Sequence, residues 1–339
     1  MRVEPAFWKG KRVLLTGAAG FIGNALVNQL LAFGADVSAV IRTSDFSLPY
    51  FGGPSWKLQR IRAFTGDVRD YQTVQRAMVQ AEPQVIFHLA AVTQVVEAKR
   101  MPLETYQTNV MGTVNVCEAA RDVAPDASLV IASSDKAYGR QDAAATADTP
   151  FNPHHPYDAS KAAADLAALS YARHYRVPLA LTRMANVYGP GDTNWRRIIP
   201  GTIRSVMRQE DVIVRSDGKQ VRDYLFITDA VAGYLTLAQF LHTDGNWKRR
   251  SLAEGKAFNF AGQSAKVIDI VRLIAATMRY TREPVVLGQA LDETPVLRLD
   301  DMDTRDVLGW EPKTSLAAGI DATINWLGQC LHPTRKELQ

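Results

Sequence analysis

The feature that most constrains this chain is a regular alternation of strand-like and helix-like runs over its first 185 residues. Short apolar runs, expected as strands at residues 13–15, 36–41, 61–65, 84–89, 128–133 and 179–183, alternate with segments of helical periodicity at 22–33, 73–80, 103–123 and 157–175. Strands rich in Val, Ile and Leu suit a parallel sheet covered on both faces, and intervening helices supply the cover. The pattern predicts a doubly wound α/β domain over residues 1–185.

After residue 185 the elements become shorter and breakers more frequent, beginning with Gly-Pro-Gly-Asp at 189–192. Helices are expected at 197–209, 228–241, 267–278 and 315–331, strands at 212–214, 224–227 and 257–261, and a surface loop at 242–256. The shorter elements and the breakers favour a smaller mixed α/β domain over residues 186–331 that closes over the first. The substrate is expected to bind to this domain. The strand near 257–261 is expected to return to the first sheet.

Composition excludes several classes of function. The 39 basic and 35 acidic residues leave a net charge of +4, and the basic run at 248–250 is too short to indicate a nucleic-acid partner. Two cysteines, Cys117 and Cys330, cannot build a disulfide framework, and the adjacent His154 and His155 lack metal-pair spacing, so no metal is expected. No stretch approaches the roughly 18 apolar residues of a membrane span. Without a visible secretory signal, the expected location is the cytoplasm.

A glycine-rich run, Thr-Gly-Ala-Ala-Gly-Phe-Ile-Gly at residues 16–23, joins the first expected strand to the first expected helix. Glycines at such a junction allow a tight turn and a close approach of a pyrophosphate, which the free N–H groups of the helix N-terminus then bind. A glycine-rich turn without a ligand is the alternative. The strand before it and the helix after it favour a dinucleotide site.

The end of the second strand distinguishes between two dinucleotides. An acidic residue about 20 positions after the glycines binds the ribose hydroxyls of NAD, whereas this chain has Arg42 followed by Thr43 and Ser44. The arginine suits the 2′-phosphate of NADP(H), so the sequence favours NADP(H) as the cofactor. The alternative is NAD(H), with Arg42 exposed to solvent. Asp67, after the third strand, is a candidate partner for the adenine amino group, or a simple turn-forming residue.

Tyr157 and Lys161 form the most informative pair in the chain. Residues four apart lie on one helix face, so both side chains can share a site. An ammonium beside a phenol favours the phenolate and lowers a Tyr pKa that is ordinarily about 10. Such a phenol can take a proton from a sugar hydroxyl while hydride leaves the same carbon. The expected strand ending in Ser133 and Ser134 opens on the same crevice.

Taken together, these motifs resemble the extended branch of the short-chain dehydrogenase/reductase superfamily, which contains nucleotide-sugar epimerases and dehydratases. The resemblance covers nearly the whole chain. It rests on the glycine run, Leu-Ala-Ala at 89–91, Asn109, Tyr157 with Lys161, Arg-Met-Ala-Asn-Val-Tyr-Gly-Pro at 183–190, Gln-Val-Arg-Asp-Tyr at 220–224 and Leu-Gly-Trp-Glu-Pro at 308–312.

The resemblance implies a role for each matched residue. Tyr157 would be the catalytic base, Lys161 would hold the nicotinamide ribose, and Ser133 would hydrogen-bond the sugar's 4-hydroxyl. Ser134 is the other candidate for that hydrogen bond and would otherwise contact the substrate. The nucleotide-diphosphate hexose would be held by Asn186, Arg197 and Arg222. The cofactor contacts implied by resemblance and position are Gly17, Gly20, Phe21, Ile22, Arg42, Asp67, Val68, Leu89, Ala90, Ala91, Tyr157 and Lys161. Helices 103–123 and 157–175 resemble the two-helix face through which this branch forms a homodimer with a four-helix bundle.

The residues after the serines separate chemistries within the branch. A 4,6-dehydratase needs an acid for the departing 6-hydroxyl and a base for the C5 proton, and Asp135 and Lys136 are candidates for those two roles. Ser-Asp-Lys-x-Tyr resembles CDP-glucose 4,6-dehydratases, which usually carry Lys where this chain has Ile22. Arg42 with its two hydroxyl neighbours resembles GDP-mannose 4,6-dehydratases, which use NADP. A 4,6-dehydratase is therefore expected, with a 4-epimerase and a non-catalytic NADP-binding regulator as alternatives.

Overall fold

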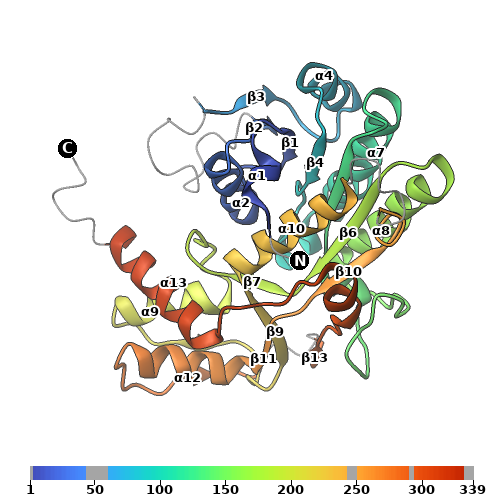
Figure 1. Cartoon of the computed structure of the whole chain (residues 1–339). Coiled ribbons are helices and arrows are strands. Elements are labelled where there is room, and N and C mark those ends of the chain that lie inside the picture. The colour runs from blue at the N-terminus through green and yellow to red at the C-terminus, as the bar shows by residue number, and fades with distance from the viewer. Residues whose placement is uncertain (1–2, 43–59, 243–249, 290–293, 332–339) are drawn as a thin grey trace.

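A seven-stranded parallel sheet forms the larger layer of the molecule (Figure 1). The computed structural model describes residues 3–42, 60–242, 250–289 and 294–331. The strands lie in the order β10-β6-β5-β4-β1-β2-β3. Their bounds are β1 (Arg12–Thr16), β2 (Asp36–Ile41), β3 (Arg62–Thr65), β4 (Val85–His88), β5 (Ser128–Ser134), β6 (Leu179–Met184) and β10 (Ala257–Phe260). The predicted doubly wound α/β fold is confirmed, and β10 pairs with β6 as the returning strand.

Helices cover both faces of this sheet. One face carries α2 (Phe21–Ala32) and α10 (Ile227–Leu241), and the other carries α4 (Tyr71–Ala81), α7 (Gly112–Val123) and α8 (Pro156–Tyr175). Successive strand residues point to opposite faces, so β1 contributes to two separate cores. Val13 and Leu15 lie in the core beneath α2 and α10, and Leu14 lies in the core beneath α4 and α7.

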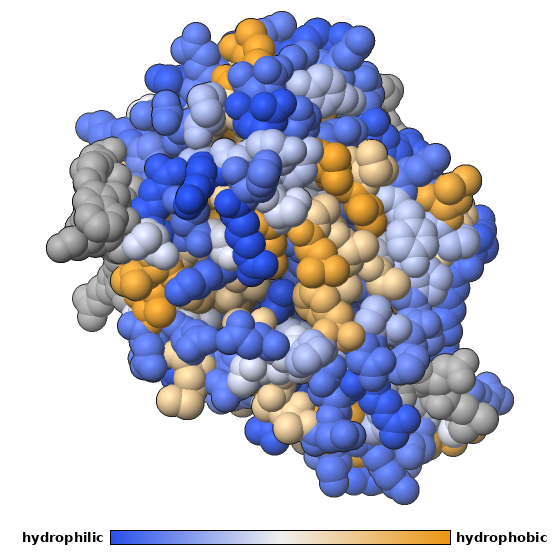
Figure 2. Space-filling view, turned by 90° about the vertical axis from the view of Figure 1, so that its right-hand side faces the viewer, coloured by the Kyte–Doolittle hydropathy of each residue, from blue (hydrophilic) through white to orange (hydrophobic). Residues whose placement is uncertain are grey.

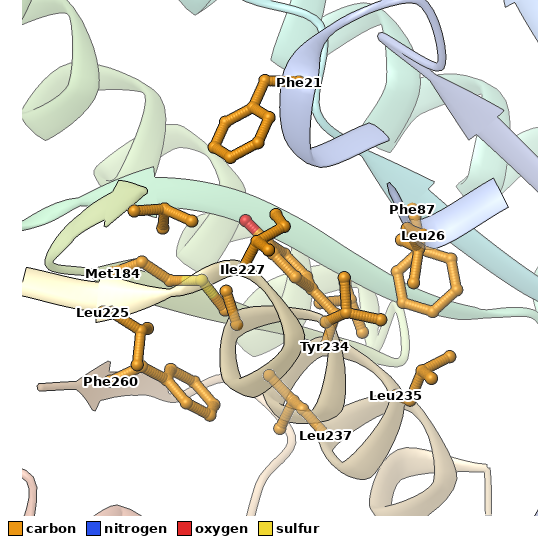
Figure 3. Close-up of a cluster of buried hydrophobic side chains, with 14 of the residues drawn as sticks. Phe21, Leu26, Phe87, Met184, Leu225, Ile227, Tyr234, Leu235, Leu237 and Phe260 are labelled. Carbon is orange, nitrogen blue, oxygen red and sulfur yellow. The ribbon is translucent and has the colours of Figure 1, made fainter. Parts of the chain in front are cut away.

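The core beneath α10 is built around Tyr234. Its ring lies edge-on to Phe87 of β4, with centroids 6.4 Å apart. Figure 3 shows Leu26 of α2 beside Phe87, and Met184 of β6 on the other side of Tyr234. Although α10 falls within the predicted second domain, it therefore packs on the large sheet.

The smaller part contains two short sheets. A four-stranded sheet is centred on β9 (Val221–Phe226), which pairs with β7 (Asn186–Tyr188), β11 (Gln263–Lys266) and β13 (Val296–Leu297). A two-stranded sheet joins β8 (Ile213–Val214) to β12 (Val285–Val286). Three helices pack beside these sheets: α9 (Ile198–Met207), α12 (Val267–Thr277) and α13 (Leu316–Leu331). Within the described residues, no helix is both long and apolar enough to cross a membrane.

The remaining elements are short. They are α1 (Pro5–Trp8), α5 (Val95–Arg100), α6 (Pro102–Tyr106), the 3₁₀ turn η4 (Asp135–Tyr138) and the π-helical turns η3 (Gln107–Met111) and η5 (Thr304–Leu308).

The expected 103–123 helix is correct in extent but is not a uniform α-helix. The π-helical turn η3 separates α6 from α7 and contains the buried Asn109. The Asn109 amide accepts from Val92 N at 2.7 Å and donates to Val92 O at 3.0 Å and to Ser160 Oγ at 2.9 Å. The turn thus lets one side chain hold the loop after β4 against α8.

Candidate active site

A cavity of about 1110 Å³ opens at the carboxyl ends of the central strands. Its walls come from the glycine run, the loops after β2, β3 and β4, the end of β5, helix α8 and the smaller part of the molecule. In an open parallel sheet this is where ligands bind. Every predicted cofactor and substrate contact lines the cavity, and so do Ser133 and Lys136.

The glycine run is shaped by close backbone approaches. Gly17 has φ +74°, and a Cβ there would lie 2.6 Å from the Ala90 nitrogen. A Cβ on Gly23 would lie 2.1 Å from the Gly17 carbonyl oxygen. The turn at Gly17 therefore lies directly against the loop after β4, and the first turn of α2, beginning at Phe21, packs against that turn with its free N–H groups towards the cavity. This cradle fits the pyrophosphate of a nicotinamide dinucleotide.

Arg42, directly after β2, and Asp67, in the loop after β3, both line the cavity. Asp67 accepts hydrogen bonds from Arg69 N at 2.9 Å and from Arg69 Nη2 at 2.8 Å. Burial alone would raise the pKa of Asp67, but these bonds and the nearby charges of Arg69 and Arg42 hold it below its ordinary value. Asp67 thus forms a local turn and faces the cavity as an anion.

Tyr157 and Lys161 are both buried in the first turns of α8, and both line the cavity. The Lys161 ammonium donates to the Ala132 carbonyl at 2.8 Å. Burial lowers the pKa of Lys161 to about 8 and raises the pKa of Tyr157. Ser134 and Arg197 are the main groups that oppose this rise. Both side chains reach one cavity, as the spacing predicts. The prediction of a lowered Tyr157 pKa is wrong here, because burial and the charges of Asp135 and Asp158 outweigh the Ser134 hydrogen bond and Arg197.

The two serines at the end of β5 have different surroundings. Ser134 contacts the Tyr157 phenol and donates to Asp135 Oδ1 at 2.9 Å. Ser133 is the cross-strand neighbour of Arg183 on β6 and lies near the Asp165 carboxyl, whose pKa it helps to hold down. The structure therefore places Ser134 beside the phenol, whereas the sequence prediction chose Ser133. The signal that sequence reasoning lacked was the register of β5 against β6.

Asp135 and Lys136 follow at once in η4. The Lys136 ammonium lies 3.4 Å from Asp135 Oδ1 and donates to Asn186 Oδ1 at 3.0 Å. Asp135 is only 3% exposed, and its Oδ2 has no hydrogen-bond partner among the described residues. A buried carboxylate oxygen without a partner is costly. Unlike Lys136, however, Asp135 is not among the residues that line the cavity.

The remaining predicted substrate residues come from the smaller part. Asn186 begins β7, and Arg222 of β9 donates to Val221 O at 2.8 Å. Arg197 pairs with Asp192 at 3.1 Å and lies 5.9 Å from the Phe21 ring centroid. Asp192 is 1% exposed. Its ion pair with Arg197 was not predicted, although Gly191 and Asp192 precede Arg197 closely in the sequence.

Comparisons with known proteins agree with this geometry. A family model described as "NAD dependent epimerase/dehydratase family" matches residues 13–249. The chain is 29% identical to a CDP-glucose 4,6-dehydratase of Salmonella typhimurium, over 96% of this chain and 92% of the relative. It is 30% identical to a UDP-glucose 4-epimerase of Mycolicibacterium smegmatis, over 93% of this chain and 98% of the relative.

Similar solved structures likewise include both a 4-epimerase and a 4,6-dehydratase. A Thermotoga maritima UDP-glucose 4-epimerase with UDP-glucose superposes with a TM-score of 0.82 at 25% identity, covering 94% of this chain and 99% of that one. A dTDP-glucose 4,6-dehydratase from Streptomyces venezuelae, DesIV, with NAD bound superposes with a TM-score of 0.79 at 26% identity, covering 94% and 97%. The chain belongs to the NAD-dependent epimerase/dehydratase family of extended short-chain dehydrogenases/reductases, enzymes that modify nucleotide sugars.

Proposed function

We propose that the protein is a nucleotide-sugar 4,6-dehydratase, which converts an NDP-hexose to the NDP-4-keto-6-deoxyhexose. The observation that carries this proposal is the ionic pair of Asp135 and Lys136, 3.4 Å apart, next to Tyr157. A 4-epimerase needs only removal and return of hydride at C4. The elimination of water needs an acid and a base besides the tyrosine, and this pair supplies both types of group.

In the proposed cycle Tyr157 takes the proton of the 4-hydroxyl, which Ser134 positions by a hydrogen bond. A nicotinamide cofactor held by the glycine run and Lys161 would supply the hydride acceptor for C4 and the hydride donor for C6. The C4 ketone acidifies the C5 proton. After a proton passes from the Lys136 ammonium to the Asp135 carboxylate within the ion pair, the neutral amine of Lys136, or a group close to it, removes the C5 proton. Asp135 protonates the departing 6-hydroxyl, so that one water is released and a 4-keto-6-deoxy sugar remains. We assign to Ser134 the role that the sequence placed on Ser133, because Ser134 contacts the phenol.

We further propose that the cofactor is NADP(H), because Arg42 lines the cavity where the adenosine ribose lies in this fold. Asn186, Arg197 and Arg222 are proposed to hold the nucleotide diphosphate and sugar, since all three come from the smaller part of the molecule and line the cavity. NAD is the alternative cofactor; the Streptomyces venezuelae relative has NAD bound.

A 4-epimerase is the second candidate. The 30% identity to a UDP-glucose 4-epimerase and the superposition with another favour it. In that case Asp135 and Lys136 would be a structural ion pair and Tyr157 would act alone on C4. The non-catalytic NADP-binding regulator has least support, because a sensor has no need of the buried Tyr157.

We also propose a homodimer that buries the outer faces of α6–α7 and α8. Large apolar side chains are exposed there, namely Leu103, Tyr106, Met111 and Leu166. The side of the molecule that carries α7 and α8 faces the viewer in Figure 2, and an orange apolar band runs through it. Such bands are typical of interfaces, and two helices from each chain would form a four-helix bundle. Light scattering that gives the mass of one chain would contradict this proposal.

The test of function is mass spectrometry after incubation with CDP-glucose, GDP-mannose, UDP-glucose, dTDP-glucose or UDP-N-acetylglucosamine, each with NAD and with NADP. Loss of one water from a nucleotide sugar is the expected result. An unchanged mass with inverted C4 stereochemistry by NMR would replace the dehydratase with the epimerase.

A further inference from the structure

Arg69, in the loop between β3 and α4, contacts two carboxylates of the cavity wall. Its Nη2 donates to Asp67 Oδ2 at 2.8 Å, and its Nη1 lies 3.9 Å from Glu104 Oε1 of α6. Asp67 and Glu104 both line the cavity, whereas Arg69 does not. The guanidinium therefore lies beside the wall and reaches the cavity only through these two side chains. The proposed catalytic cycle assigns Arg69 no task.

The backbone of this loop is held without the Arg69 side chain. Asn115 Nδ2 of α7 donates to the carbonyls of Val68 and Arg69, at 2.9 and 3.0 Å. Asp70 caps the N-terminus of α4 with its side chain. The Arg69 backbone N–H donates to Asp67 Oδ1 at 2.9 Å. Truncation of the Arg69 side chain should therefore leave the loop in place and remove only the contacts of the guanidinium.

The two ion pairs of Arg69 lie close to solvent. The Arg69 side chain is 40% exposed, and those of Asp67 and Glu104 are 26% and 39% exposed. Such pairs contribute little to folding, because water screens them and ordering two side chains costs entropy. What the guanidinium supplies is direction, since its donors form a rigid fork that fixes where the Asp67 carboxylate points.

Asp67 and Val68 offer an acceptor and a donor side by side on the cavity wall. An ionised carboxylate only accepts, and its two oxygens have about four lone-pair sites, of which Arg69 takes two. Val68 also lines the cavity, and its backbone N–H has no acceptor among the residues that the structure describes.

This pair of groups matches one purine and opposes another. The Watson–Crick edge of adenine offers an amino donor and, beside it, the acceptor nitrogen N1. Hypoxanthine has the reverse pattern at the same two positions, a carbonyl acceptor and a protonated N1. A carboxylate held toward this edge accepts from the amino group of adenine and meets only the lone pairs of the hypoxanthine carbonyl.

We propose that Arg69 is a positioning residue that holds the Asp67 carboxylate toward the purine of the bound cofactor, so that the site selects adenine by its amino group. The inference rests on the proposed function, which places a nicotinamide dinucleotide in this cavity. Glu104 is the second anchor of the guanidinium and holds the fork from α6 while the fork orients Asp67. Cofactor binding needs no turnover, so the selection is measured apart from the dehydratase reaction.

The test is fluorescence titration of the full chain with NADH, with NADPH and with the hypoxanthine analogue of each. The wild type should bind the adenine cofactor at least about tenfold more tightly, as expected for loss of a hydrogen bond to a charged group. In Arg69→Met this preference should fall to about threefold or less, through weaker binding of the adenine cofactor. Arg69→Lys keeps a cationic donor and should restore part of the preference. The matched control is Arg76→Met, because Arg76 is an exposed arginine of α4 that donates to Thr73 Oγ1 at 3.1 Å.

The ratio of the two dissociation constants separates positioning from general damage. A purely structural role for Arg69 would weaken both purines equally and keep the wild-type preference, which would overturn the inference. Urea unfolding of Arg69→Met should match the wild type.

Asp67→Asn tests the premise, because an amide can turn either its oxygen or its amino group to the base, so the preference should vanish. A wild type that binds both purines equally would also overturn the inference. If the wild type binds none of the four dinucleotides, the proposed function itself fails.

Discussion

The Lys136 ammonium donates to the side-chain oxygen of Asn186 at 3.0 Å. This bond joins the turn after β5, in the large sheet, to β7 of the small sheet. Asn186 in turn donates to the Asp223 carbonyl of β9 at 3.3 Å. The groups proposed for elimination are thus anchored to both parts of the molecule, at the point where the sugar would lie between them.

Asp135→Asn should stop the elimination of water while leaving oxidation at C4 intact. The amide keeps the size of the side chain but cannot supply a proton, so we expect dehydration to slow by about 10² to 10⁴, the usual contribution of a general acid. With the substrate identified by mass spectrometry, reduced cofactor should accumulate at 340 nm. A wild-type rate of water loss in this variant would return Asp135 to a structural role.

Tyr157→Phe separates an enzyme from a regulator. The ring keeps its packing, so nucleotide-sugar affinity measured by calorimetry should stay within about twofold, whereas turnover should fall by at least about 10² because the proton acceptor is gone. In the wild type the pKa of Tyr157 is raised by burial, so the phenolate fraction and the rate should increase as pH rises from 6 towards 8. Unchanged turnover in the phenylalanine variant would exclude Tyr157 as the base.

How far the sequence predicts this fold depends on the length of each element. The strands of the large sheet and the long helices were all predicted within a few residues, because several turns or alternations define their period. The strands β8, β12 and β13 have two residues each, and of these only β8 was predicted. For such short pieces, the partner strand and not the local pattern decides the structure.

The residues of the site also fall into two groups: those that a local motif predicts and those that only the fold brings together. Tyr157 with Lys161, and the glycine run, are local motifs on one helix or one turn, so spacing alone brought them together. The choice between Ser133 and Ser134 depended on strand register, and the pairing of Asp192 with Arg197 depended on how one loop folds over Phe21.

Arg42→Ala should reduce the preference for NADP. Loss of a charged hydrogen bond to the 2′-phosphate corresponds to about 1.5–3 kcal/mol, or roughly 10- to 100-fold in Kd for NADPH, while NADH affinity stays within about twofold. Arg62→Ala is a matched control, because Arg62 is an exposed arginine on the neighbouring strand β3 that donates to the Gln80 carbonyl at 2.8 Å. Fluorescence titration with both cofactors gives the ratio. Equal losses for NADH and NADPH would contradict a 2′-phosphate contact.

Gly23→Ala should damage both stability and cofactor binding. The added methyl carbon would lie 2.1 Å from the Gly17 carbonyl oxygen, so the turn that cradles the pyrophosphate must shift. Such overpacking costs about 1–3 kcal/mol of unfolding free energy. Gly328→Ala in α13 is the matched control: its nearest neighbour is Met207 Cε at 3.8 Å, and alanine in a helix favours folding by up to about 1 kcal/mol. Urea unfolding and NADH titration of both variants test the contrast. A Gly23→Ala protein with wild-type stability and affinity would show that the turn at Gly17 need not approach α2 so closely.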